Sequence, residues 1–195
     1  MLTLASASET RAKMFQDVGL EIEAIASGVD EDILKDQFRN TGRCADDLAD
    51  ALAEAKAKAV AIDRTGLVLG ADQVLSFDGE TFDKAHDLKE VRGQLQRLRG
   101  KQHLLLSAAV IVENGSAVWR RIGRATLTMR DFSDPFLDQY LREEGEAILH
   151  SVGGYRIEAR GAQLFSEISG DYFSILGLPL LEVLEFLRER KVLIG

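Results

Sequence analysis

The sequence contains very little cysteine and proline. Its 195 residues include one cysteine, Cys44, and two prolines. A single cysteine forms no internal disulfide and has no second thiol with which to build a metal site, so disulfide-stabilised and thiolate-zinc folds are excluded. The first residues lack the basic start and apolar stretch of a secretory signal. We therefore expect a cytoplasmic protein in a reducing compartment.

Long apolar runs and an excess of positive charge are also absent. The longest apolar stretch, Leu104 to Val112, is well short of the ~20 residues that cross a bilayer and is predicted to be a strand. The chain carries 24 Lys and Arg against 32 Asp and Glu, a net charge of −8. A membrane protein and a binder of long nucleic acid are therefore not expected. A nucleotide remains compatible, because local cations or a bound divalent ion can attract a small polyanion.

Several common catalytic motifs are missing. The sequence has no GxxxxGK[ST] P-loop, no GxGxxG after a strand, no HExxH and no GxSxG elbow. The three histidines are isolated and lack the spacing of metal ligands. These absences argue against P-loop enzymes, dinucleotide-binding enzymes and zinc proteases. Cys44 has no nearby partner, so we interpret it as an inert thiol.

Hydrophobic patterning predicts one α/β domain. Hydrophobic residues make up 46% of the chain and charged residues 29%, which is typical of a globular protein with one core, in one or two lobes. Apolar residues at steps of three and four indicate helices, and continuous or alternating apolar runs indicate strands. The chain order is predicted as a strand at 2–5, a helix ending at Gly19, a helix at 46–62, a strand at 67–71, a hairpin at 74–82, a helix at 88–98, a hairpin at 104–129 turning at Asn114-Gly115, and helices at 133–144 and 181–190. This order indicates a mixed sheet flanked by helices.

The turn between the first strand and the first helix carries residues suited to an anion. Ser8 stands at the N-cap position, and Arg11 falls on the same side of the helix. The free N–H groups and the dipole of a helix N-terminus favour a phosphate. The alternative is a capped helix with a solvated arginine, and Glu9 in the first turn would repel phosphate.

Two charged residues fall in apolar surroundings. Lys56 lies in the apolar stripe of the helix at 46–62, whereas Lys58 does not. Its ammonium group either snorkels past the edge of the core or reaches an anionic group in a site. Asp72 follows the apolar run at 67–71, at the end of the predicted strand. A buried carboxylate there needs a cation, a metal or several donors, and a turn or a structural salt bridge is the alternative.

Two further charged positions are open to more than one interpretation. Asp30, Glu31 and Asp32 form an acidic triplet, which is typical of a solvated loop and less often supplies one metal ligand. Lys84 lies just past the first hairpin, where a surface lysine is the ordinary expectation.

Taken in order, these positions resemble the Maf family of nucleotide pyrophosphatases, also called septum formation proteins. LASASETRAKMF is similar to the family's LASxSPRRxxLL, LAEAKA around Lys56 to LAxxKA, GADQV around Asp72 to GAD(T/Q)V, and DKA around Lys84 to GKP. Glu31 in VDED matches the family's glutamate after the second strand, and ISGDYFSILGLPL at 168–180 is similar to IxGDYxxVxGLPL. The resemblance covers nearly the whole chain. It implies a Maf/ITPase-like fold, a single two-lobed domain with a central cleft.

The resemblance also implies an activity. Members hydrolyse a nucleoside triphosphate to the monophosphate and pyrophosphate, by attack of water on the α-phosphorus, which keeps modified nucleotides out of nucleic acids. Glu31 and Asp72 would hold Mg²⁺ or Mn²⁺, and Asp72 would also serve as the base, a division that the sequence leaves open. A homodimer is implied as well. The residues that would bind the triphosphate are Ser8, Arg11, Lys56 and Lys84.

Three positions are the expected determinants of base preference. Thr10 replaces the first arginine of the family motif, and Gln73 replaces the threonine common in the branch that acts on dTTP and UTP. Glu158 in YRIEA replaces the glutamine of YGIQG. This combination resembles the branch that hydrolyses 7-methylguanosine triphosphate. A carboxylate at Glu158 would accept hydrogen bonds from the guanine N–H edge and favour the cationic methylated ring.

Departures from the family motifs leave other functions open. Glu9 and Ala85 replace two prolines of the motifs. The alternative is a nucleotide-binding regulator of septum formation with little catalysis, which would bind nucleotides without turnover. A third reading is a surface-binding module with no small-molecule site, and such a module would tolerate Asp72→Asn and Lys56→Ala.

Overall fold

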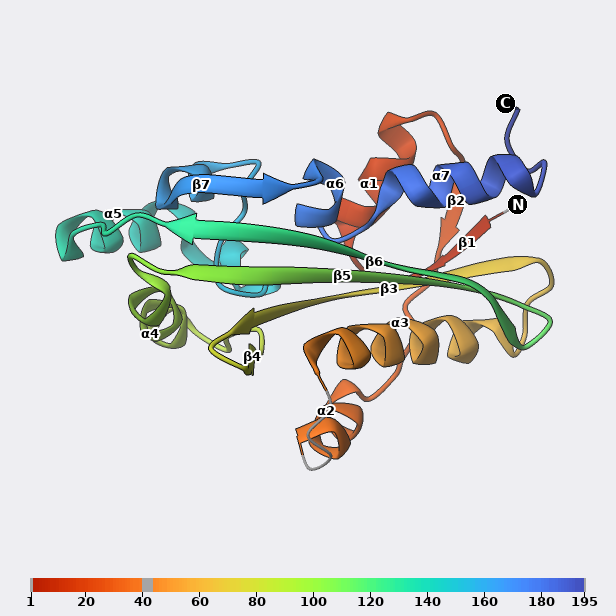
Figure 1. The fold of residues 1–195 in the computed structure, drawn as a ribbon, viewed down its shortest axis with the longest axis horizontal. Coiled ribbons are helices and arrows are strands. Elements are labelled where there is room, and N and C mark those ends of the chain that lie inside the picture. Colours follow the sequence, from red (N-terminus) through yellow and green to blue (C-terminus); the bar gives the residue numbers. More distant parts are fainter. Residues whose placement is uncertain (1, 40–43, 195) are drawn as a thin grey trace.

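A mixed sheet runs the length of the molecule (Figure 1). The computed structural model describes residues 2–39 and 44–194, and within them the sheet has seven strands in the order β2-β1-β3-β5-β6-β7, with β4 paired to β3. β1 is parallel to β2 and β3, and the other pairs are antiparallel. The strands are β1 Leu2–Ala5, β2 Ile22–Ala24, β3 Leu67–Phe77, β4 Glu80–Phe82, β5 Gln102–Glu113, β6 Ser116–Met129 and β7 Phe165–Gly170.

Helices cover both faces of this sheet, which confirms the predicted fold class. α1 and α7 pack on one face and α3 on the other, while α4 and α5 lie at the opposite end of the long strands (Figure 1). None of the helices in the described ranges has the length and apolar content needed to span a bilayer. The helices are α1 Glu9–Asp17, α2 Glu31–Arg39, α3 Ala45–Ala61, α4 Leu88–Leu98, α5 Asp134–Glu144, α6 Tyr172–Ile175 and α7 Leu180–Glu189, with 3₁₀ helices at Gly145–His150 and Arg160–Leu164.

Most predicted helices and strands are confirmed. The residues that begin or end them act through short-range contacts, which a sequence shows directly. The side chain of Ser8 accepts a hydrogen bond from the N–H of Arg11 and caps α1, and the side chain of Ser133 caps α5 in the same way. Asn114 and Gly115 both have positive φ angles, +51° and +78°, as the tight turn between β5 and β6 requires.

The predicted break after Asp72 is wrong. β3 is one continuous strand, and Asp72 lies in its middle, opposite Ala108 of β5. A carboxylate is tolerated inside a buried strand only when a partner compensates its charge. Lys56 supplies that compensation, as described below, so no turn is needed.

The core forms three clusters along the sheet. Two lie on opposite faces at the end that carries β1: one is built with α1 and α7, the other with α3. The third fills the end that carries α4, α5 and β4. Asp72 falls on β3 between Ala71, which belongs to the α1–α7 cluster, and Val74, which belongs to the α3 cluster, and the strand then enters the third cluster at Leu75. The middle of β3 is therefore where the three cores meet.

α3 approaches β3 unusually closely, and a glycine permits it. A Cβ atom at Gly70 would lie 2.0 Å from the carbonyl oxygen of Ala53 and 2.6 Å from the nitrogen of Ala57. Both alanines are fully buried. The small residues thus bring the backbone of α3 against β3, next to the strand position of Asp72.

A histidine and a tyrosine form a buried polar pair in the third cluster. His103 is 2% exposed, and its Nε2 lies 2.7 Å from the hydroxyl oxygen of Tyr155. Its Nδ1 is buried and has no hydrogen-bond partner in the described part of the chain. Burial disfavours the charged imidazolium and lowers the pKa of His103 from 6.5 to about 4. The folded protein therefore holds His103 neutral.

This shift predicts a loss of stability in mild acid. Between pH 6.5 and about 4 the unfolded chain binds a proton at His103 that the folded chain does not, so stability falls as the pH falls through this window. The full effect is about 3 kcal/mol, at 1.36 kcal/mol for each pKa unit. Urea denaturation of the wild type and of His103→Gln at pH 7 and pH 4.5 should show the smaller pH dependence in the variant. Equal pH dependence in the two proteins would contradict this origin.

Candidate active site

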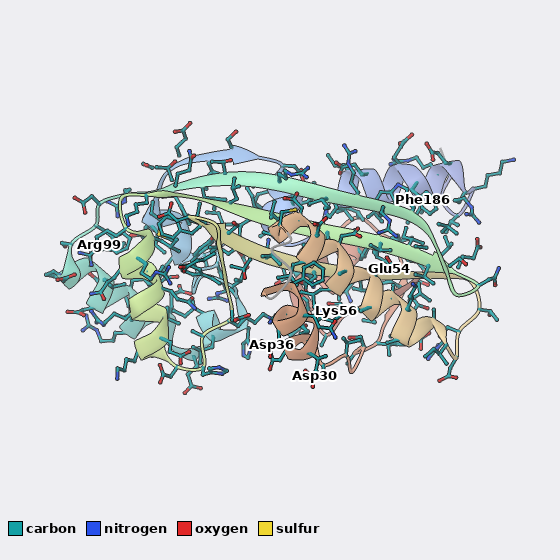
Figure 2. The ribbon with its side chains drawn as sticks, turned by 60° about the horizontal axis from the view of Figure 1, so that its bottom comes forward. Asp30, Asp36, Glu54, Lys56, Arg99 and Phe186 are labelled. Carbon is teal, nitrogen blue, oxygen red and sulfur yellow. The ribbon has the colours of Figure 1, made fainter. Side chains whose placement is uncertain are left out.

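A buried lysine joins two carboxylates at the centre of the molecule. The Nζ atom of Lys56 lies 2.5 Å from Oδ1 of Asp72 and 2.6 Å from Oε1 of Glu31. Lys56 comes from α3, Asp72 from β3 and Glu31 from the first turn of α2, and Figure 2 shows Lys56 on the part of α3 that lies near α2. The lysine is 9% exposed, so it reaches into a site and does not snorkel to solvent. Lys58, in contrast, is exposed and pairs with Glu54 on its own helix.

The lysines also determine the charge of Glu31. Burial alone would raise the pKa of this carboxyl group, but hydrogen bonds and positive charge from Lys56 and Lys35 outweigh that effect. The net result is that the pKa of Glu31 lies below its usual range. Glu31 is therefore an ionised acceptor at neutral pH, and it is the first helical residue of α2 and not part of a solvated loop.

Lys84 reaches the same charge cluster from the segment after β4. Burial of its ammonium group lowers the pKa of Lys84, and the positive charges of Arg11 and Lys56 lower it further, while Glu31 and Asp72 act in the opposite direction. Arg11, Glu31, Lys56 and Asp72 are therefore near enough to Lys84 to influence its ionisation. The side chain still has an exposed surface. A crowded group of cations with access to solvent is suited to a polyanionic ligand.

Arg11 ties the first helix to two other segments. Its Nε donates to the carbonyl of Gly177 at 2.8 Å, and its Nη1 donates to the carbonyl of Ala71 at 3.1 Å and to Oγ of Ser6 at 3.2 Å. The N–H of Ser8 also donates to Oγ of Ser6. Two of the three guanidinium nitrogens of Arg11 are thus engaged with the protein. Arg11 therefore fixes the turn before α1 next to Ala71, the residue that precedes Asp72 in β3.

Gln73 anchors α6 to the sheet. Its Nε2 donates to the carbonyl of Ile175 at 2.9 Å, to Oγ of Ser107 at 3.0 Å and to the carbonyl of Ser174 at 3.2 Å. Alternation along β3 places this side chain on the face opposite to Asp72. The amide nitrogen of Gln73 is therefore engaged with protein acceptors, and the role of Gln73 in base preference stays a prediction.

Glu158 is an exposed residue in the loop between the two 3₁₀ helices, and contacts of neighbouring residues hold this loop in place. Nη2 of Arg156 donates to Oε2 of Glu144 at 2.8 Å, and the hydroxyl of Tyr140 donates to the carbonyl of Gly154 at 3.1 Å. A fixed loop with an exposed carboxylate can present that group to a ligand.

The structure thus brings most of the predicted residues to one place. Arg11, Glu31, Lys56, Asp72 and Lys84 form a single charge cluster. Of the other predicted residues, Ser8 is the N-cap of α1, Thr10 lies in its first turn and Gln73 follows Asp72 on β3, whereas Glu158 lies apart, between the two 3₁₀ helices.

The carboxylates of the cluster fit a hard divalent cation. Mg²⁺ is commonly bound through one or two carboxylates, with substrate phosphates and water completing its shell. Glu31 and Asp72 supply two such groups, both within hydrogen-bond distance of the same ammonium nitrogen. Within residues 2–39 and 44–194, no three His, Cys, Asp or Glu side chains gather into a metal site. The donor set therefore suits a cation that arrives with a phosphate ligand.

Two charged residues of the site were missed by the sequence analysis. Lys35 lies 3.4 Å from Glu31 and 3.0 Å from Asp83, which directly precedes Lys84. The signal was the spacing of four residues between Glu31 and Lys35, which places both on one side of a helix. This spacing is informative only if residues 31–35 are assigned to a helix.

Comparison with known proteins gives consistent matches over this whole arrangement. A family model described as Maf-like protein matches residues 1–190. A protein of Caulobacter vibrioides named nucleoside triphosphate pyrophosphatase is 48% identical over 187 residues, which cover 96% of this chain and 94% of the relative. A Hyphomonas neptunium protein of the same name is 45% identical over 98% of this chain and 97% of its own. A Rhizobium meliloti protein named 7-methyl-GTP pyrophosphatase is 45% identical over 97% of this chain and 96% of its own.

Lys56, Asp72 and Glu31 form a charge triad, and removing its lysine should strongly lower the stability of the fold. Lys56→Met leaves the buried carboxylate of Asp72 without its ion-pair partner, so the free energy of unfolding at neutral pH should fall by about 3 kcal/mol. Lys58→Met is the matched control on the same helix and should stay within about 0.5 kcal/mol of the wild type, because its ion pair is exposed. Urea denaturation measures both. Similar values for the two variants would contradict the compensating role of Lys56.

Proposed function

The chain belongs to the Maf-like protein family, and from that membership we propose that it is a nucleoside triphosphate pyrophosphatase whose active site is the charge cluster around Lys56. The observation that carries the assignment is the buried ammonium of Lys56 between the carboxylates of Asp72 and Glu31, with Arg11 and Lys84 beside it. These are the cations and carboxylates that hydrolysis of a phosphoric anhydride requires.

The cations of the cluster are the proposed binding groups for the triphosphate. Lys56 and Lys84 face the phosphate oxygens, and the capped N-terminus of α1 at Ser8 adds the positive end of a helix dipole. Arg11 holds this N-terminus in place and contributes its charge. The positive charge stabilises the pyrophosphate as it leaves, because negative charge develops on its bridging oxygen.

Asp72 is the proposed general base. Its carboxylate orients a water molecule and accepts a proton as the water oxygen bonds to the α-phosphorus. The bond from the α-phosphorus to the bridging oxygen breaks, and pyrophosphate departs with the electron pair. The hydrogen bond from Lys56 fixes the orientation of the carboxylate.

We propose Mg²⁺ or Mn²⁺ as the cofactor, held by Glu31 and Asp72. When bound, the ion supplies positive charge against the phosphate oxygens and increases the acidity of water. A carboxylate is a weak base at neutral pH, and a bound ion would offset this weakness.

The proposed substrate is a guanine nucleotide, with 7-methyl-GTP as the first choice. Support comes from the carboxylate of Glu158 on its fixed loop and from the name of the Rhizobium meliloti relative. A carboxylate is complementary to the N–H edge and the positive ring of 7-methylguanine. Thr10 and Gln73 accompany it as the other expected determinants. As further parts of the proposal, the enzyme acts in the cytoplasm as a homodimer and keeps modified nucleotides out of nucleic acids.

Pyrophosphate release from a panel of nucleoside triphosphates, in the presence of Mg²⁺ or Mn²⁺, tests this function. Asp72→Asn should lower kcat by about 100-fold or more, the usual contribution of a general base. Asp17→Asn, a change in an exposed pair with Lys13, is the control and should retain activity. Wild-type protein that binds nucleotides without releasing pyrophosphate would overturn the proposal in favour of a regulator of septum formation.

The base preference gives a separate test at Glu158. Glu158→Gln removes the negative charge and keeps the shape, so kcat/KM for 7-methyl-GTP should fall by roughly 10-fold relative to that for unmodified GTP, the size of one lost charge-assisted hydrogen bond. Glu146→Gln, in the neighbouring 3₁₀ helix, is the control. An unchanged ratio between the two substrates would show that Glu158 does not contact the base.

A further inference from the structure

Lys35 on α2 is a cation that the proposed reaction does not use. Its Nζ lies 3.0 Å from Oδ1 of Asp83 and 3.4 Å from Oε2 of Glu31. The side chain of Lys35 is 20% exposed, whereas that of Lys58 in its surface pair is 52% exposed. Exposed lysine pairs contribute little because water screens them. The low exposure and the two acceptors distinguish Lys35 from an ordinary surface lysine.

The two partners of Lys35 belong to different parts of the core. α2 packs through Leu34 and Phe38 against the cluster built with α3. Asp83 lies between Phe82 and Ala85, which are both buried in the cluster at the α4–α5 end. The ion pair of Lys35 with Asp83 therefore connects two separately packed regions, on the side of the molecule that carries the active site.

Lys35 also extends the charge cluster. Asp83, Lys35, Glu31, Lys56 and Asp72 form a chain in which each lysine contacts two carboxylates. At one end of this series of ion pairs, Asp83 is adjacent to Lys84 in the sequence. At the other end, Asp72 is fixed in β3. A displacement of Lys35 would therefore affect both Glu31 and the segment that carries Lys84.

We propose that Lys35 is a positioning residue of the active site, which holds Glu31 on α2 and the Asp83–Lys84 segment at a fixed separation so that both face the same triphosphate. This inference rests on the proposed function, because it assigns Glu31 and Lys84 to one substrate. Lys35 acts through these neighbours and does not itself touch the reacting atoms.

Kinetics with five variants test the assignment. Lys35→Met should lower kcat/KM for the preferred nucleotide by roughly 10-fold, the effect typical of losing a group that orients a ligand-binding side chain. Lys35→Arg should recover most of the loss, and Lys58→Met should match the wild type. Lys35→Met and Asp83→Asn both remove the ion pair between these two residues, so the loss in the double variant should be smaller than the product of the losses in the two single variants. Wild-type kinetics in Lys35→Met, or multiplied losses in the double variant, would overturn the proposal.

Hydrogen exchange without nucleotide provides a readout that does not depend on turnover. Lys35→Met and Asp83→Asn should each increase amide exchange in α2 and in residues 83–88 together, while exchange in α5 stays unchanged. Faster exchange in only one of the two segments would show that Lys35 does not couple them, and would overturn the inference. If the wild type releases no pyrophosphate, the proposed function fails, and the exchange experiment still decides whether Lys35 couples the two segments.

Discussion

The ion pairs of Lys56 are the interaction on which the rest of the structure depends. A buried ammonium group is tolerated only when carboxylates compensate its charge, and Asp72 and Glu31 do so at 2.5 Å and 2.6 Å. This requirement brings three elements into contact. The small residues at Gly70 and along α3 allow the helix to approach β3, and α2 begins at the residue that supplies the second carboxylate.

The same requirement prepares the molecule for a phosphorylated ligand. Charges that are fixed before the ligand arrives need little reorganisation during the reaction, which is the main source of electrostatic catalysis. Around the triad, Arg11 fixes the turn at Ser8 to Gly177, and Gln73 fixes the neighbouring α6 to the sheet. Backbone carbonyls of the motif at 168–180 accept hydrogen bonds from Arg11 and Gln73. The motif therefore helps to position the residues that surround the site.

The sequence predicted features that depend on local chemistry and missed those that depend on partners far along the chain. Caps, hairpin turns and the apolar stripe of α3 were read correctly because each is encoded within a few residues. The continuity of β3 through Asp72 was missed, because it depends on Lys56 from another element. α2 was missed because its acidic start resembles a loop. Lys35 was overlooked for the same reason, since its pairing with Glu31 depends on that helix. The charge cluster itself was predicted from family resemblance, since no local pattern shows that Glu31, Lys56 and Asp72 come together.

The central claim is that this cluster directs water to the α-phosphorus of a nucleoside triphosphate. Hydrolysis of 7-methyl-GTP in water labelled with the heavy oxygen isotope, followed by mass spectrometry of the products, tests it most directly. We predict one labelled oxygen in the nucleoside monophosphate and unlabelled pyrophosphate. Label in pyrophosphate, or release of labelled orthophosphate, would mean attack at another phosphorus and would contradict the account.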